Sequence, residues 1–254
     1  MAESSMFDTL VSAYAGSRPG YPAAVFEALP ELARRPLAGS RVADVGAGTG
    51  IFSRQLRERG AVVTAVELSE PMLRQLVADS PGVGAALGSA NALPLRTGAV
   101  DFVSFAQAWH WVNPESAVPE VLRVLAPGGA LACVWNTPVS DAPWRLGYND
   151  RIRELIGREP AYGNESTGFD QEPRIDLGSF ASALRTRVFK TAWSRTIPIE
   201  QRLLNVQSRS YAGTVPPERL AAFLANERAI LLKHFPDGMV VEEYITWLGV
   251  VRKP

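Results

Sequence analysis

The sequence has very little of what marks secreted, membrane-spanning or metal-binding proteins. It contains one cysteine, Cys133, and two histidines, so no disulfide can form within the chain and no Cys/His cluster has metal-ligand spacing. No apolar run reaches transmembrane length, and the N-terminus lacks the basic and apolar segments of a secretory signal. We therefore expect a soluble cytoplasmic protein without a metal centre.

A surplus of charge of either sign is also absent. The 26 Lys and Arg residues balance 26 Asp and Glu residues, and the sequence pI is near 6.8. No overall field draws such a chain to nucleic acid or to an anionic membrane, so we expect a small-molecule partner. Most basic residues are Arg and Ala is abundant, a composition typical of GC-rich bacterial genomes. The sequence carries no signal for an oligomeric state.

The apolar content, 46% of 254 residues, is enough for one sizeable core. In the first half of the chain, short apolar runs alternate with segments of helical spacing, which predicts a mostly parallel, doubly wound sheet. Predicted strands cover 42–45, 61–67, 83–87, 100–106 and 130–136. Predicted helices cover 51–59, 71–80 and 114–125, with another beginning at Pro22.

The pattern changes at Thr137, after which proline, tryptophan and arginine punctuate the chain through Pro173. Further on, the predicted elements are a strand over 186–199, helices over 206–211 and 217–235, and a terminal strand over 239–251, antiparallel at the sheet edge. We expect a lid and a nucleotide-binding core over 1–136, an inserted helical substrate cover over 137–185, and the last core strands over 186–254, with further cover helices at about 200–236.

The most informative motif is DVGAGTG, from Asp44 to Gly50, between a predicted strand and a predicted helix. Gly46 and Gly48 can adopt positive φ and let a ligand lie against bare backbone at a helix N-terminus. Glu67, which ends the next apolar run, is placed to hold a ribose diol. The spacing G-x-G-x-G differs from the G-x-G-x-x-G of dinucleotide folds and favours S-adenosylmethionine over NAD.

Six segments together resemble the class I S-adenosylmethionine-dependent methyltransferases, and more narrowly the small-molecule type 11, trans-aconitate methyltransferase-like group. They are FDTLVSAYAGSRPGYP, VADVGAGTGIFS, VTAVELSEPML, GSANALPL, AQAWHWV and EVLRVLAPGG, and they cover most of residues 7–130. With the predicted strands, the resemblance implies a Rossmann-like α/β fold: a mostly parallel seven-stranded sheet, an antiparallel terminal strand and a helical substrate cover. The implied methyl donor is S-adenosylmethionine, and the implied product is S-adenosylhomocysteine.

The resemblance also implies which residues contact the donor. Gly46, Ala47 and Gly48 would approach its methionine part and ribose, while Asp44 braces the loop. Glu67 would bind the ribose hydroxyls. The candidates for the donor's carboxylate are Tyr14 and Arg18.

The adenine contacts that the resemblance implies come from three later segments. Leu68 would lie beside the ring, and Ser89 and Ala90 would face its edge. Ala106 or Gln107 would offer a carbonyl to the amino group.

His110 is the candidate catalytic residue, because neutral imidazole can accept a proton near pH 7 and because this residue follows the fourth predicted strand. The alternative is that His110 only forms a wall of the pocket. A set of aromatic residues suggests an apolar acceptor pocket, although burial in the core is the default for any one of them. With His110, the predicted acceptor-binding residues are Trp109, Trp111, Trp135, Trp144 and Tyr148. Arg145, Arg151 and Arg153 could instead clamp a carboxylated acceptor.

These features favour a methyltransferase acting on O, N or C of a small-molecule metabolite in bacterial secondary metabolism. A cyclase or decarboxylase that keeps S-adenosylmethionine without moving the methyl group is the alternative on the same fold. An NAD-dependent oxidoreductase and a non-catalytic interaction module are weaker alternatives, the former because the chain lacks the third fingerprint glycine and any Tyr-x-x-x-Lys pair.

Overall fold

The computed structural model describes residues 17–139, 141–157, 175–209 and 212–254. The predicted N-terminal lid, including Tyr14, lies outside these residues, as does much of the predicted cover over 137–185. The described chain divides into two compact units. Of the described residues, the sheet unit comprises 20–136, 175–191 and 246–254, and the helical unit comprises 17–19, 137–139, 141–157, 192–209 and 212–245.

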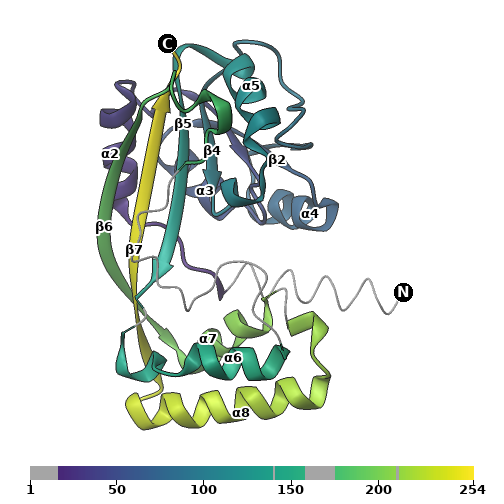
Figure 1. The fold of residues 1–254 in the computed structure, drawn as a ribbon, viewed down its shortest axis with the longest axis vertical. Coiled ribbons are helices and arrows are strands. Elements are labelled where there is room, and N and C mark those ends of the chain that lie inside the picture. The colour runs from purple at the N-terminus through teal and green to yellow at the C-terminus, as the bar shows by residue number, and fades with distance from the viewer. Residues whose placement is uncertain (1–16, 140, 158–174, 210–211) are drawn as a thin grey trace. The chain divides into compact units, whose positions relative to one another are not determined.

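The described strands form one seven-stranded sheet with the order β3-β2-β1-β4-β5-β7-β6. The first four strands are β1 (Arg41–Val45), β2 (Val62–Glu67), β3 (Gly84–Leu87) and β4 (Val100–Ala106). The longer strands, drawn next to one another in Figure 1, are β5 (Leu125–Pro138), β6 (Thr186–Pro198) and β7 (Met239–Arg252). β1 pairs in parallel with β2 and β4, β2 with β3, and β4 with β5, which confirms the predicted mostly parallel sheet.

The helices of the sheet unit are α2 (Ala23–Ala33), α3 (Ile51–Glu58), α4 (Glu70–Asp79) and α5 (Pro114–Val124). Its 3-10 turns are η1 (Trp109–Trp111) and η3 (Gly178–Phe180). Phe26 of α2 stacks on Phe52 of α3 with ring centroids 5.2 Å apart, and both rings belong to a buried cluster with Phe102 of β4 and Leu248 of β7. This apolar cluster anchors α3, and with it the glycine loop that precedes α3.

The helical unit contains α6 (Tyr148–Ile156), α7 (Ile199–Gln207) and α8 (Pro217–His234), which Figure 1 shows gathered together. The short turns η2 (Pro143–Arg145) and η4 (Ala212–Thr214) accompany them. The predicted helix over 206–211 is wrong, because α7 begins directly after β6. Ile199, Leu203 and Val206 recur at helical spacing and are buried, and this apolar stripe continues from the strand without a linker.

The terminal strand β7 is antiparallel, as predicted, but it does not lie at the sheet edge. The Lys253 N–H donates to the Gly129 carbonyl at 2.8 Å, and the Thr246 hydroxyl donates to the Asn136 side chain at 2.5 Å, so the two strands run in opposite directions. β7 lies between β5 and β6. Burial explains the order: every residue from Trp247 to Val251 is buried on β7, whereas β6 exposes most of its side chains, as an edge strand does.

Candidate active site

The glycine loop joins β1 to α3 in the sheet unit, and its backbone requires glycine. Gly46 and Gly48 have φ of 66° and 57°, in the left-handed region that other residues rarely adopt. A Cβ on Gly46 would lie 2.7 Å from the Ala108 Cβ, so this glycine lets the end of β4 approach the loop. A Cβ on Gly48 would meet nothing nearer than the Met72 sulfur at 4.0 Å. Gly48 therefore faces open space that a ligand can fill.

The loop's amides are largely bonded within the protein. The N–H groups of Gly46 and Ala47 donate to the Val66 carbonyl at 2.8 and 3.3 Å, and the Gly50 N–H donates to the Ala47 carbonyl at 2.9 Å. The bare backbone that the sequence predicts for ligand contact is therefore the Cα side of the loop rather than its N–H groups. These bonds tie the loop to the end of β2, where Glu67 is found.

Glu67 is the carboxylate that the structure places against this loop. One of its oxygens accepts a hydrogen bond from the Gly48 N–H and the other from the Ser69 N–H, each at 2.8 Å. A carboxylate can accept about four hydrogen bonds, so both oxygens keep capacity for a ligand. A pair of ribose hydroxyls matches that capacity. Leu68, beside it, is 72% exposed and offers an apolar surface to a ring.

Asp44 faces inward and accepts hydrogen bonds from two hydroxyls. Ser53 of α3 donates to it at 2.5 Å and Ser104 of β4 at 2.7 Å, and the side chain is fully buried. Burial raises the pKa of Asp44 to about 6, although the two serine bonds oppose that shift. Asp44 thus joins β1, α3 and β4 beneath the loop. The sequence alone had no means of identifying Ser53 and Ser104 as its partners.

We expect Asp44 to make the stability of the fold fall as pH rises from about 4 to about 6. An unfolded aspartate ionises near 3.8 and the native one near 6, so the native state alone holds the proton in this interval. The free energy of unfolding should fall by about 3 kcal/mol across it and then stay level. Urea unfolding of the wild type and of Asp44→Asn, which lacks this ionisation, measures the difference at each pH. Wild-type stability that stays constant or rises relative to that of Asp44→Asn between pH 4 and pH 6 would contradict the assignment.

The chain just after β4 is held in a strained conformation. Gln107 has φ of 58°, rare for a residue other than glycine. Its N–H donates to the Val134 carbonyl and its side-chain amide donates to the Asn136 carbonyl, each at 2.8 Å. Asn136 in turn donates to the Gly20 carbonyl at 2.8 Å. Such strain costs about 1–3 kcal/mol and persists where the surroundings enforce it, commonly at functional sites.

Ser89 and Ala90 follow β3 and lie near the same group of residues. The Gly88 N–H donates to the Glu67 backbone carbonyl at 3.0 Å, which brings this turn beside the end of β2. Both side chains are half-buried. The sheet unit therefore brings together the glycine loop, Glu67 and Leu68, Ser89 and Ala90, and Ala106 with Gln107.

The turn η1 presents two of its three aromatic side chains outward. Trp109 is buried, packs edge-on against Phe105 and donates its indole N–H to the Asp176 carbonyl at 2.9 Å. Trp111 is 62% exposed, with its ring 5.2 Å from that of His110. The His110 side chain also reaches solvent, and partial burial lowers its pKa below the ordinary value of 6.5. His110 is therefore neutral at pH 7, as a proton acceptor must be.

The other predicted acceptor residues are core residues of their own units. Trp135 is buried in β5 of the sheet unit. In the helical unit, Trp144 and Tyr148 are buried, and the Arg202 guanidinium lies 5.5 and 5.1 Å from their ring centroids. Arg18 is half-buried in the same unit.

Two of the three arginines considered as a carboxylate clamp are already paired within the helical unit. Arg151 bonds Glu227 at 2.5 Å, and Arg153 bonds Asp150 in the preceding turn of α6. Arg145 is buried against the Trp144 ring. These contacts favour a structural role for all three.

A Rossmann-like sheet with a glycine loop and a carboxylate after the second strand defines a protein that binds an adenosyl cofactor. A methyltransferase domain model matches residues 43–133. An uncharacterised methyltransferase of Mycobacterium tuberculosis is 39% identical over 229 residues, which is 90% of this chain and 86% of the relative. The chain belongs to the class I S-adenosylmethionine-dependent methyltransferases.

Two further comparisons agree with this assignment. A demethylmenaquinone methyltransferase of Renibacterium salmoninarum is 33% identical over 130 residues, covering 51% of this chain and 54% of that one. The solved structure of an Anaeromyxobacter dehalogenans protein assigned as a type II methyltransferase superimposes with a TM-score of 0.64 at 23% identity, over 92% of this chain and 96% of that one. The latter likeness supports the fold.

The residues present fit S-adenosylmethionine, the methyl donor of this enzyme class. The open space over Gly48 and the remaining acceptor capacity of Glu67 are the two observations that support the fit. In the described ranges, no three or more His, Cys, Asp or Glu residues form a group that could hold a metal ion. Within the same ranges, every helix is too short or too polar to span a membrane.

Proposed function

We propose that this enzyme transfers a methyl group from S-adenosylmethionine to O, N or C of a small-molecule metabolite. The observation that carries the proposal concerns the chain just after β4. There the strained Gln107 is followed, within four residues, by the exposed side chains of His110 and Trp111. A neutral imidazole beside an exposed indole suits an acceptor that has an apolar ring or chain and a proton to lose. The zero net charge adds no general attraction for nucleic acid.

The proposal also assigns different parts of the chain to donor binding and to acceptor binding. Residues 1–136 supply the lid and the donor site, residues 137–185 and the helices at about 200–236 form the acceptor cover, and 186–254 completes the core. The demethylmenaquinone relative is named for a small-molecule acceptor, which supports this substrate class. We further propose a bacterial, cytoplasmic enzyme of secondary metabolism.

The contribution of this chain to the reaction is positioning and proton transfer. S-adenosylmethionine, when bound, supplies a methyl group already activated by its sulfonium. Glu67 and the glycine loop hold the ribose, and the chain after β4 orients the acceptor, so that the two reactants meet in line. For a hydroxyl or an acidic carbon, His110 takes the proton that the acceptor loses. A carboxylate acceptor would need no base.

A panel of metabolites incubated with the enzyme and a methyl-labelled donor tests the proposal. We expect one class of small molecules to acquire the label while S-adenosylhomocysteine accumulates in equal amount. An unlabelled product that is an isomer of its substrate, or lighter than it by CO2, with no S-adenosylhomocysteine, would identify the alternative cyclase or decarboxylase. Transfer of label to RNA or protein alone would contradict the small-molecule proposal.

Replacing His110 with Ala should lower turnover about 100-fold and leave donor affinity unchanged. Because the pKa of His110 lies below 6.5, the wild-type rate should fall as pH drops through that lowered value. The variant should not show this fall in rate at low pH, the acid limb of the pH profile. Steady-state kinetics across pH, with calorimetry of S-adenosylhomocysteine binding, measure both quantities.

His234→Ala is the matched control, because that histidine is exposed at the end of α8 in the helical unit. It should retain both the rate and the acid limb. Equal losses of turnover and donor affinity in His110→Ala would show that His110 only shapes the pocket wall.

A further inference from the structure

A cavity of about 700 Å³ lies at the end of the sheet unit opposite the glycine loop. Gly128, near the start of β5, lines it, and β5 starts beside Val100, the first residue of β4. Arg252, at the end of the antiparallel β7, lines the same cavity. The glycine loop, in contrast, follows the carboxyl end of β1. This cavity is therefore separate from the donor site.

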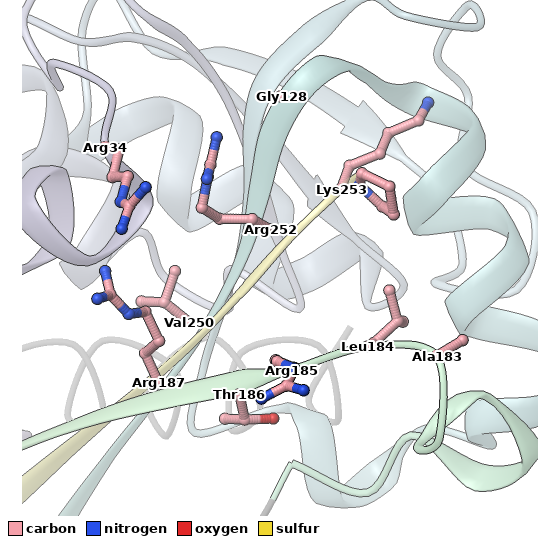
Figure 2. Close-up of a pocket in the computed structure, with 11 residues that line it drawn as sticks. Arg34, Gly128, Ala183, Leu184, Arg185, Thr186, Arg187, Val250, Arg252 and Lys253 are labelled. Carbon is pink, nitrogen blue, oxygen red and sulfur yellow. The ribbon is translucent and has the colours of Figure 1, made fainter.

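Basic side chains dominate the cavity wall. Its lining includes Arg34, Arg185, Arg187, Arg252 and Lys253, and no acidic residue. Figure 2 shows the guanidinium groups of Arg34, Arg187 and Arg252 on the same side of β7. Arg34 directly follows α2, Arg187 lies in β6 and Arg252 ends β7, so the fold collects them from distant parts of the chain.

Only some of these basic side chains form hydrogen bonds with other parts of the protein. The Lys253 ammonium donates to the Leu122 and Leu125 carbonyls at 2.6 and 2.7 Å, which closes the end of α5. Arg187 reaches the Leu32 carbonyl at 3.4 Å. Among the described residues, neither Arg34 nor Arg252 has a carboxylate partner.

Asp101, an acidic residue of the same unit, is already paired with other arginines. Arg35, the neighbour of Arg34 in sequence, donates to Asp101 at 2.7 Å, and Arg41 donates to the same carboxylate at 3.1 Å. Two guanidinium groups therefore share Asp101, so this carboxylate already has its partners and does not neutralise the cavity arginines. A concentrated positive charge in a chain of zero net charge indicates an anionic ligand.

We propose that this cavity binds an oligophosphate group, such as the di- or triphosphate of a nucleotide. Guanidinium forks recognise phosphate oxygens bidentately and stay charged at any working pH. Several of them around one concave site match several linked phosphates better than one isolated carboxylate. The volume lies within the range of small-molecule sites, about 300–1,000 Å³. Because this basic cluster lines one concave site, a small ligand fits it better than an extended nucleic-acid strand.

Isothermal titration of the full chain with tripolyphosphate and with ATP, at about 0.15 M NaCl, tests this site. We expect both to bind, and the double variant Arg187→Gln/Arg252→Gln to weaken each at least about tenfold. Equal affinities would mean that only the phosphates are recognised, and tighter ATP binding would mean that the nucleoside also contacts the cavity. Either pattern supports the proposal.

The control is Arg57→Gln/Arg96→Gln, which removes the same charge from exposed positions of the sheet unit outside the cavity. It should change oligophosphate affinity less than about twofold. Binding of S-adenosylhomocysteine by both double variants checks the fold and the donor site independently. Absence of tripolyphosphate binding, equal binding of citrate, or equal weakening in the two double variants would overturn the proposal.

Discussion

Replacing Glu67 with Ala should weaken binding of S-adenosylmethionine about 100-fold without unfolding the protein. The substitution removes the acceptor for two ribose hydroxyls, and hydrogen bonds to a charged group are each worth about 1.5–3 kcal/mol. It also leaves the Gly48 and Ser69 N–H groups without their partner, so the loop keeps only its backbone bonds to Val66 of β2. Calorimetry with S-adenosylmethionine and S-adenosylhomocysteine measures the affinities.

Glu58→Ala is the matched control, because Glu58 is exposed at the end of α3 in the same unit. It should bind the donor as the wild type does. Glu67→Gln should not rescue the loss, because the NH₂ group of the amide would face one of the two N–H donors, Gly48 or Ser69. Unchanged donor affinity in Glu67→Ala would show that the adenosyl group binds elsewhere.

The second large effect is expected on stability, from Glu242→Ala in the helical unit. Glu242 is 1% exposed and accepts from Arg195 at 2.7 Å and from the Tyr244 hydroxyl at 2.8 Å. Arg202, also buried, lies 3.4 Å from its other oxygen. Burial and this carboxylate together raise the pKa of Tyr244 to about 12, so Tyr244 remains the donor.

Removing this carboxylate takes away the buried negative charge that the Arg195 and Arg202 guanidinium groups face. The expected loss is about 3–5 kcal/mol, which lowers Tm by about 10 °C in a chain of this size. Differential scanning calorimetry gives the shift. Glu200→Ala is the control, because Glu200 pairs with Arg228 at an exposed position of the same unit and should cost less than about 1 kcal/mol. Equal shifts in the two variants would contradict the central role of Glu242.

The first half of the fold could be predicted in detail because its signals are local. The strand expected over 100–106 is β4, residue for residue, since apolar residues begin and end abruptly there. The glycine loop and Glu67 were recognised from spacing alone, and the structure joins them through the Gly48 N–H. The sequence prediction carries the strand through Ile199 and so misses helix α7, which begins directly after Pro198, the last residue of β6.

The sequence by itself determined the class of the protein. Strand and helix periodicity, three loop glycines and one spaced carboxylate each lie within about 25 residues, and the proposed donor site is built from them. Only the tertiary structure decided the position of β7 inside the sheet and the burial of Glu242, which an alternating strand could equally have exposed to water. It alone also gathered Arg34, Arg187 and Arg252 around one cavity. The reason is that strand order, burial and charge pairing depend on contacts between residues far apart in the chain, and no local pattern encodes them.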